Sequence, residues 1–202
     1  MSRSNTTLTD KINLRRLALS DVPHPVVLEV FGGTGEIYDH CYQSIRRGIV
    51  FEKNEPRANF LGLQRPHWLV YEGDAIAAIR EGVGSHIISV NFVDVDAFGN
   101  PFEAIESFFS SPLCQSAFFP ITFVVTDGMR QKAKYKTSYQ VKCLHDAVVH
   151  FGNEAVYPRY LEVCQFVMDG LASSRGYFLK NFRGYYCGKS MTHYVATVSK
   201  SG

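Results

Sequence analysis

Acidic side chains follow the second and third apolar segments of this chain, and a glycine-rich turn follows the first. Residues 29–35 read Glu-Val-Phe-Gly-Gly-Thr-Gly, Glu52 ends the second segment, and Asp74 comes shortly after the third. Glycines in such a turn let the backbone approach a ligand closely, and a carboxylate at the end of the neighbouring strand can accept both hydroxyls of a ribose. Singly, Glu52 and Asp74 are also typical of acids at helix N-termini. Together the three segments predict a site for a nucleoside-containing cofactor.

The segment 93–101, Val-Asp-Val-Asp-Ala-Phe-Gly-Asn-Pro, combines carboxylates with an aromatic side chain at the expected end of a fourth strand. A carboxylate such as Asp96 can accept hydrogen bonds from an exocyclic amine, turn its lone pair out of the ring and take its proton. An aromatic side chain such as Phe98 can stack on a flat ring such as a nucleic-acid base. Asp94 is the second candidate acid. The two acids also fit a turn that caps the helix starting near Pro101, and this interpretation stays open.

Basic and aromatic side chains alternate in the segment 130–136, Arg-Gln-Lys-Ala-Lys-Tyr-Lys. It follows the fifth expected strand, so it belongs at the same edge of the sheet as the acidic groups. The candidate contacts with a phosphate backbone are Arg130, Lys132, Lys134 and Lys136. A solvated loop is the alternative interpretation of the same pattern.

Short apolar stretches alternate with amphipathic stretches over most of the chain, which is typical of β-α-β units. The expected parallel strands are residues 26–30, 48–52, 68–71, 86–92 and 120–126, and the helices between them begin near Glu36, Glu55, Ala75 and Pro101. Two long helical stretches, 136–151 and 154–171, are separated by Gly152 and Asn153. Residues 177–186 and 191–198 are rich in aromatic and β-branched side chains and are joined by a short polar turn, which predicts a closing antiparallel hairpin.

The predicted fold class is therefore α/β. We expect a seven-stranded, Rossmann-like sheet that is mostly parallel, with a C-terminal antiparallel hairpin and helices on both faces. Residues 1–24 would form an N-terminal arm or helix, and residues 25–202 would form a single domain.

The composition is that of a folded globular domain: 202 residues, 46% hydrophobic and 20% charged, with a net charge of +2. This charge neither requires nor excludes a nucleic-acid partner. No apolar run approaches the ~20 residues that a membrane span needs. The five cysteines and seven histidines are dispersed, without the spacing of a metal site or a disulfide framework. We expect a soluble, cytoplasmic protein with no membrane segment and no metal.

The order of these motifs resembles that of the class I, Rossmann-like S-adenosylmethionine-dependent methyltransferases. The pattern Glu29-x-Phe31-x-Gly33-x-Gly35 is similar to their first motif, particularly in nucleic-acid methyltransferases, and the likeness covers roughly residues 25–200. The resemblance implies that S-adenosyl-L-methionine is the cofactor, with the glycine turn under its methionine part, the acid at 52 on the ribose and the acid at 74 on the adenine amine. The contacts that it implies are Glu29, Phe31, Gly33, Gly35, Glu52, Lys53, Asp74, Ala75 and Asp94.

The segment 94–101 is similar to the Asp-x-Asp-Pro-Phe-Gly-Ser-Pro motif of the tRNA guanine-N2 dimethyltransferases and, more loosely, to the Asp/Asn-Pro-Pro-Tyr motif of enzymes that methylate exocyclic amines. This likeness implies that Asp96, Phe98 and Asp94 act in catalysis. It also implies that the target is an exocyclic amine of a nucleic-acid base, with RNA favoured over DNA. Ala97 stands where both motifs have proline, which makes the turn less rigid and leaves the target atom open.

Other functions fit parts of the pattern. The glycine turn and Glu52 also suit a nicotinamide cofactor of an oxidoreductase, but Tyr38 occupies the position where dinucleotide sites place a third glycine. A catalytically inactive binding module of the same fold is supported by Ala97. A methyltransferase for a small molecule or a protein is a further alternative. The sequence leaves the oligomeric state open.

Overall fold

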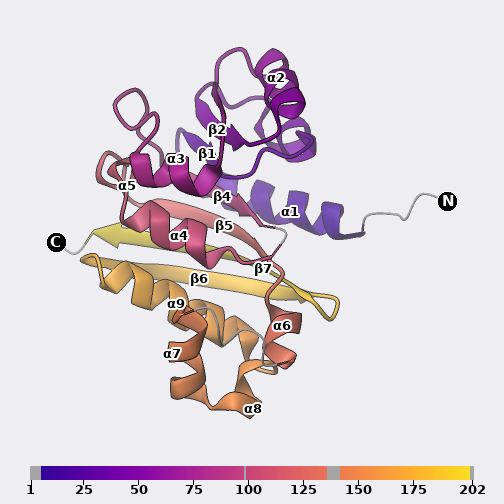
Figure 1. Ribbon diagram of the computed structural model, residues 1–202, viewed down its shortest axis with the longest axis vertical. Coiled ribbons are helices and arrows are strands. Elements are labelled where there is room, and N and C mark those ends of the chain that lie inside the picture. Colours follow the sequence, from indigo (N-terminus) through magenta and orange to yellow (C-terminus); the bar gives the residue numbers. More distant parts are fainter. Residues whose placement is uncertain (1–5, 98, 136–141, 201–202) are drawn as a thin grey trace.

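The structure, a computed structural model, describes residues 6–97, 99–135 and 142–200. The strands within this part form one seven-stranded sheet in the order β3-β2-β1-β4-β5-β7-β6 (Figure 1). Their bounds are β1 Val27–Glu29, β2 Gly48–Glu52, β3 Leu69–Glu72, β4 Phe92–Asp96, β5 Ile121–Asp127, β6 Tyr177–Cys187 and β7 Met191–Lys200. The first five strands are parallel, while β7 is antiparallel to both β5 and β6. This confirms the predicted mixed sheet and its closing hairpin.

Helices cover both faces of the sheet, and a separate apolar core lies on each (Figure 1). One face carries α3 (Ala75–Glu81), α4 (Phe102–Phe109), α5 (Pro112–Gln115), α7 (Lys142–Phe151), α8 (Asn153–Val156) and α9 (Tyr160–Ser173). The opposite face carries α1 (Thr6–Ser20), the π-helical turn η1 (Tyr38–Tyr42) and α2 (Glu55–Gln64). The short helix α6 (Arg130–Lys134) follows β5. Successive side chains of β4 therefore enter different cores, Val93 and Val95 the first and Phe92 the second.

The helices after β2 and β3 begin at residues suited to a helix start. The Asn54 side chain accepts a hydrogen bond from the Arg57 amide at the N-terminus of α2, and Pro56 occupies the first turn, where no amide donor is needed. Asp74 caps α3 by accepting from the Ala77 amide. Both helices thus start directly beyond the carboxyl end of a strand, and that geometry places the residues of the loops at one edge of the sheet.

Two predicted elements are wrong in their limits. The fourth strand spans residues 92–96 and not 86–92, because Ile88 and Val90 are buried in an irregular segment that approaches the sheet. These two residues are apolar because they are buried, although they form no pairs with a neighbouring strand of the described sheet. The stretch 154–171 is divided into α8 and α9, with Pro158 in the turn between them. Of the stretch 136–151, residues 136–141 lie outside the described part, and the helix there begins at Lys142.

The N-terminal segment belongs to the packed structure. Leu14 and Ala18 of α1 are buried in the second core, where α1 packs on β5, β7 and η1. Figure 1 shows the helix behind the sheet, on the side away from α4. This position brings its first turns to the carboxyl ends of the parallel strands.

Candidate active site

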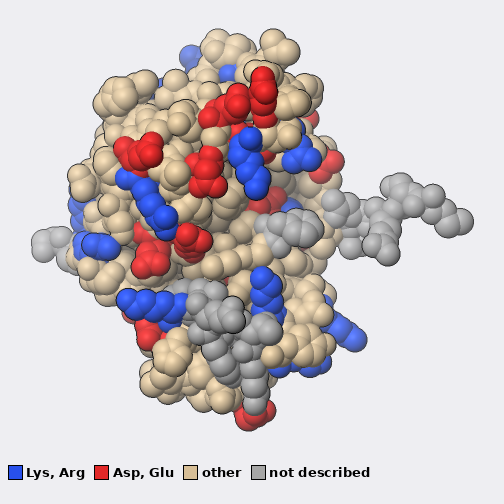
Figure 2. Space-filling view, viewed as in Figure 1, with Lys and Arg blue, Asp and Glu red and all other residues tan. Residues whose placement is uncertain are grey.

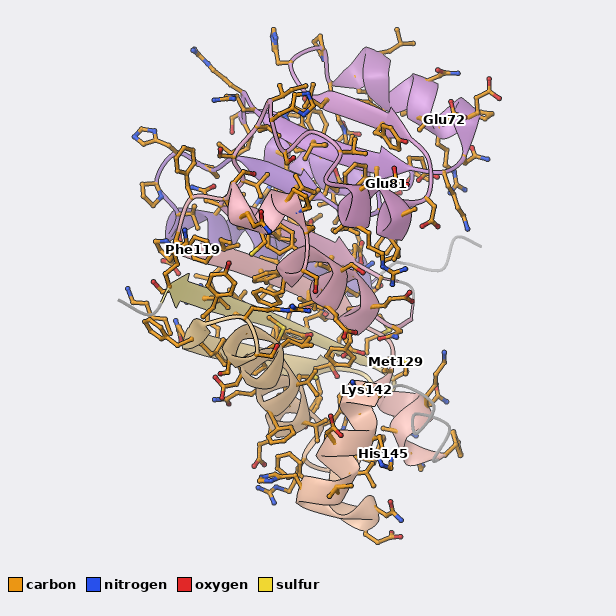
Figure 3. The ribbon with its side chains drawn as sticks, turned by 60° about the vertical axis from the view of Figure 1, so that its left-hand side comes forward. Glu72, Glu81, Phe119, Met129, Lys142 and His145 are labelled. Atoms are coloured by element: carbon orange, nitrogen blue, oxygen red, sulfur yellow. The ribbon has the colours of Figure 1, made fainter. Side chains whose placement is uncertain are left out.

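A cavity of about 700 Å³ opens at the carboxyl ends of the parallel strands. Figure 3 identifies this edge, because Glu72, at the end of β3, and Met129, after β5, lie on one side of the molecule, whereas Phe119, before β5, lies on the other. The predicted cofactor contacts that line the cavity are Glu29, Phe31, Gly33, Gly35, Glu52, Lys53, Asp74 and Ala75. Its volume is typical of a site for a small molecule.

The glycine turn forms one wall of this cavity. Gly33 and Gly35 have φ angles of 56° and 84°, in the left-handed region that favours glycine. A Cβ atom added at Gly33 would meet nothing within 4 Å, so this residue faces open space. A Cβ at Gly35 would lie 2.7 Å from the Gln64 side chain and 3.1 Å from Leu61. The first glycine thus leaves room for a ligand, and the second allows the turn to pack on α2.

Glu52 is held in place by two backbone donors. Its Oε2 accepts from the Gly33 amide at 2.9 Å and its Oε1 from the Asn54 amide at 2.8 Å. A carboxylate has about four acceptor positions, so each oxygen keeps the capacity for a further hydrogen bond from a ligand. The carboxylate is therefore fixed in orientation and still able to bind a pair of hydroxyls.

Glu29 lies beneath the turn and is paired with a buried arginine. Its Oε2 accepts a hydrogen bond from Arg65, whose guanidinium stacks 4.3 Å from the centre of the Tyr38 ring. Burial raises the pKa of Glu29 to about 8, although Arg65 acts in the opposite direction. The pair joins the end of β1 to the end of α2, and Glu29 is a buried part of the cavity wall.

Asp74 both caps a helix and lines the cavity. Its Oδ1 accepts from the Ala77 amide at 3.0 Å, which matches the helix-terminus alternative weighed from the sequence. Asp74 and Ala75 nonetheless contribute to the wall of the same cavity as the glycine turn. The capping bond fixes the carboxylate and leaves acceptor capacity for a ligand.

Asp94 does not line the cavity, and its predicted roles in catalysis and cofactor binding do not fit its position. It is fully buried beneath α1, where its oxygens accept from Arg15 Nη2 at 2.6 Å, Arg15 Nε at 2.7 Å and Tyr42 Oη at 2.6 Å. Burial lowers the pKa of Arg15, but Asp94, Tyr42 and Asp96 together outweigh this effect and the net shift is upward. The carboxylate joins α1 and η1 to β4.

Asp96 lines the cavity at the end of β4 and is paired with Lys11 of α1. The Lys11 Nζ atom lies 2.7 Å from Asp96 Oδ1 and 2.9 Å from Oδ2. Burial alone would raise the pKa of Asp96, but Arg15 and Lys11 together outweigh it and lower the pKa below its usual value. A carboxylate with a lowered pKa is a good hydrogen-bond acceptor and a poor proton acceptor.

Neither Lys11 nor Arg15 was predicted from the sequence as a site residue. Lys11 and Arg15 are four residues apart and share a face of α1, while Asp94 and Asp96 are two residues apart and share a face of β4. The spacing of both pairs is visible in the sequence. Their pairing required knowing that α1 crosses the sheet at this point.

A buried histidine, His193, lies two strands away from Asp96 in the sheet. Thr126 of β5 pairs with Asp96 on one side and with His193 of β7 on the other. Burial, with Arg15 and Lys11 adding to it, lowers the pKa of His193 to about 4. The imidazole is therefore neutral at physiological pH and adds no positive charge beside Asp96.

Two hydrogen bonds stabilise the turn after Asp96, which has no proline at position 97. Asn100 Oδ1 accepts from the Phe102 amide at 3.0 Å, and the Gly99 carbonyl accepts from the Gly128 amide at 3.0 Å. Ala97, which replaces the proline of the related motifs, is buried and lines the cavity. Phe98, the predicted stacking residue, lies outside the described residues.

The basic segment divides into a fixed arginine and more exposed lysines. Arg130 stacks on the Tyr186 ring at 3.6 Å and the Tyr157 ring at 4.9 Å, and it donates to the Gly188 carbonyl. These contacts join α6 to the turn of the β6–β7 hairpin. Lys132 and Lys134 are exposed, and the Lys134 Nζ atom lies 5.6 Å from the Tyr157 ring centre. Lys136 lies outside the described residues.

Asp127 anchors the start of the basic segment and makes stability depend on pH. Its Oδ1 accepts from the Met129 amide at 2.6 Å, and Tyr160 and Cys164 donate to the carboxyl group. Burial raises the pKa of Asp127 from 3.8 to about 7, although these hydrogen bonds oppose the shift. The folded state thus binds this proton more tightly, and the associated stability, present below pH 4, is lost as pH rises through 7.

Asp127→Asn is therefore expected to stabilise the protein relative to the wild type as pH rises. The amide cannot ionise and keeps an oxygen for the Met129 amide. Urea unfolding should give similar free energies for both proteins near pH 4, with the variant gaining up to roughly 4 kcal/mol by pH 8. An equal difference at both pH values would show that the folded protein holds this carboxyl group without a raised pKa.

Within the described residues, no cluster of three or more His, Cys, Asp or Glu side chains is arranged to hold a metal ion. The helices of this part of the chain also include none with the length and apolar character to cross a membrane.

No protein-family model matches the chain, and no curated protein matches it in sequence. Solved structures do match. Trm1 from Pyrococcus horikoshii, solved with S-adenosyl-L-methionine, superimposes with a TM-score of 0.66 at 12% identity over 100% of this chain and 57% of its own length. The chain has the class I methyltransferase fold. This confirms the fold-level resemblance found in the sequence.

Two further matches share this methyltransferase fold. The putative RNA methyltransferase PH1948 from Pyrococcus horikoshii has a TM-score of 0.54 at 15% identity, covering 96% of this chain and 85% of that protein. The plantazolicin methyltransferase BpumL, solved with S-adenosylhomocysteine, has a TM-score of 0.56 at 12% identity, covering 96% and 84%. This chain thus spans little more than half the length of Trm1 but most of the length of the other two proteins.

Proposed function

We propose that this protein is an S-adenosylmethionine-dependent methyltransferase. One observation carries the proposal: the glycine turn, Glu52, Asp74 and Asp96, each from a different strand end, line a single cavity of about 700 Å³ in a class I methyltransferase fold. The structures of Trm1 with S-adenosyl-L-methionine and of BpumL with S-adenosylhomocysteine support the same assignment.

The residues present fit this cofactor. The open space over Gly33 leaves room for the methionine part, the fixed carboxylate of Glu52 can accept the ribose hydroxyls, and Asp74 with the Ala75 amide can meet the adenine edge. When bound, the cofactor supplies an electrophilic methyl group on a sulfonium. Lys53 lies beside Glu52 in the cavity wall.

Asp96 would hold the amine that receives the methyl group. It stands in the cavity wall with side-chain exposure of 19%, at the far end from the Asp74 adenine site in strand order. Its lowered pKa favours hydrogen-bond acceptance over proton removal, so the carboxylate orients the amine and the proton leaves to water. This modifies the sequence-based hypothesis, in which Asp96 also took the proton.

An exocyclic amine of a nucleic-acid base, with RNA favoured over DNA, is the substrate that we propose first. The motif around Asp96 and the structural likeness to PH1948, a putative RNA methyltransferase, support it, as do exposed Lys134 and Tyr135 near the same edge of the sheet. Figure 2 shows basic and acidic side chains interspersed on the face in view. The described residues of this face form no broad positive field, so a short single-stranded segment fits it better than a long duplex.

A small-molecule or peptide amine is the second candidate. The observation that favours it is the Lys11 ammonium on Asp96, which shows that this position accommodates an alkylamine. Assays with labelled S-adenosylmethionine and separate pools of tRNA, rRNA, DNA and small metabolites distinguish the two candidates by which pool acquires label.

Calorimetry with S-adenosylmethionine and its demethylated product tests the proposed cofactor. We expect micromolar affinity, and Glu52→Ala should weaken it by about 1.5–3 kcal/mol because the ribose hydroxyls lose a charged acceptor. Glu52→Gln, which keeps one acceptor oxygen, should show a smaller loss.

Glu55→Ala is the matched control, because Glu55 is an exposed acid at the start of α2 outside the cavity wall. Its affinity should equal that of the wild type. Absence of both binding heat and thermal stabilisation at millimolar ligand would refute the assignment, since ligand at a hundred times its Kd adds about 2.7 kcal/mol. Binding of NAD instead would revive the oxidoreductase alternative.

A further inference from the structure

Lys11 places a primary amine of the protein itself in the wall of the proposed active site. Lys11 and Leu8, one helical turn earlier, are the α1 residues that line the cavity within the described part of the chain. Arg15, on the same face of α1, is paired with buried Asp94. This pair holds α1 on β4 and so fixes the position of the Lys11 amine. The side chain of Lys11 is about one-fifth exposed.

This amine occupies the place that the proposed function gives to the substrate. Its Nζ atom lies within 2.9 Å of both carboxylate oxygens of Asp96, the group that would hold the target amine. The only other lysine in the described cavity wall is Lys53, beside the proposed ribose site, for which no contact with Asp96 is found. The two lysines therefore share a cavity but differ in the contact that would orient a nucleophile.

We propose that Lys11 is a methylation site of this protein, modified by the protein's own active site when S-adenosylmethionine is bound and no substrate is present. The proposal rests on the proposed function and deepens it, since it identifies an aliphatic primary amine as a group that the site can methylate. Lys11 would then report whether the acceptor position is free or filled by substrate.

The reaction is an in-line displacement. The Lys11 ammonium first loses a proton to solvent, which reaches the partly exposed Asp96. The nitrogen lone pair then forms a bond to the methyl carbon while the carbon–sulfur bond breaks, and the sulfur keeps the electron pair as a neutral thioether. The product is a secondary ammonium, which carries the positive charge that the sulfonium has lost and can return to Asp96 with one fewer N–H donor.

Two kinetic features follow from this geometry. Because amine and acceptor carboxylate belong to one chain, the rate constant should be independent of protein concentration. Because only the neutral amine has a lone pair, the reaction should be slow at neutral pH and faster in alkaline solution.

The test is incubation of the purified protein with S-adenosylmethionine, followed by intact mass measurement and peptide mapping. We expect one methyl group or more on Lys11, none on Lys53, a first-order rate that does not change with protein concentration, and loss of the modification in Lys11→Arg. Asp96→Asn should slow modification of Lys11 by about tenfold or more, because the amine loses its orienting carboxylate. Addition of a true substrate should slow it as well.

A second measurement needs no methyl transfer. Acylation by a lysine-reactive reagent, followed residue by residue, should be slowed at Lys11 when S-adenosylhomocysteine is bound, whereas Lys180 on β6, outside the cavity wall, should react at an unchanged rate. This protection shows that the Lys11 amine faces the cofactor cavity whether or not the transfer is fast.

The outcomes separate the inference from the function on which it rests. If calorimetry detects no cofactor, the proposed function is wrong. If the cofactor binds but Lys11 stays unmodified at alkaline pH, or Lys53 is modified as fast, or the rate grows with protein concentration, the inference about Lys11 is overturned while the proposed function stands.

Discussion

Asp96→Ala is expected to reduce methyl transfer to an identified substrate by on the order of 100-fold or more while cofactor affinity changes little. The reason is the position of Asp96 at the end of β4, where its carboxylate would touch the target amine, whereas Glu52 and Asp74 are held by backbone amides. Single-turnover kinetics measures the transfer step, and calorimetry with S-adenosylhomocysteine measures the cofactor affinity.

Glu36→Ala provides a control in the same cavity. Glu36 is an exposed acid that lines the cavity beyond the glycine turn, so its removal changes the local charge by the same amount without touching the proposed amine position. We expect transfer rates within a few-fold of the wild type. If Asp96→Ala kept full activity, or lowered the rate no more than Glu36→Ala, the carboxylate would be a turn residue and amine orientation would have to come from elsewhere.

Arg15→Ala is expected to lower the free energy of unfolding by about 3–5 kcal/mol. Both partners of the Arg15–Asp94 pair have 0% side-chain exposure, so removal of the guanidinium leaves an uncompensated carboxylate in the core, with Tyr42 as its remaining side-chain donor among the described residues. This is a large fraction of the 5–15 kcal/mol that is typical of a folded domain, by rough estimate. Urea unfolding monitored by circular dichroism measures it.

Arg183→Ala tests whether burial of the ion pair explains the large loss of stability expected for Arg15→Ala. Arg183 also forms a 2.7 Å pair with an aspartate, Asp21, but the two side chains are 37% and 57% exposed. Water replaces the lost partner there, so we expect a cost below about 1 kcal/mol. The double variant Arg15→Met with Asp94→Asn should recover much of the stability lost in Arg15→Ala, because no buried charge remains and Tyr42 keeps an acceptor. Equal losses for the two arginine variants would contradict a buried, ionised pair.

The two predictions are linked through α1. Arg15 anchors the helix on β4, and Lys11, one turn earlier, reaches Asp96 from the same anchor. Relative to the wild type, a protein that lacks Arg15 should therefore show a larger increase in hydrogen-exchange rate over residues 6–20 than over the parallel strands. Loss of the helix would also remove Leu8 and Lys11 from the cavity wall.

Much of the fold could be predicted from the sequence because local signals and burial agree along most of the chain. Asn54 and Pro56 define the start of α2, and the aromatic and β-branched residues on both sides of the turn at Gly188 define the hairpin. The glycine turn and Glu52 could be predicted together because the carboxyl ends of parallel strands must meet at one edge. The fourth strand was misplaced because Ile88 and Val90 are buried without being paired.

Only the tertiary structure decided what each acid of the fourth strand does. Asp94 and Asp96 are identical side chains two residues apart on the same face of β4, and no local pattern distinguishes them. The crossing of α1 does, since it places Arg15 over Asp94 in the core and Lys11 over Asp96 at the cavity. A long-range contact of this kind depends on how helix and sheet pack, and the spacing within each segment does not reveal which residues of the two segments will meet. The sequence by itself therefore determined the fold and the edge where the site lies, and packing determined which carboxylate faces a ligand.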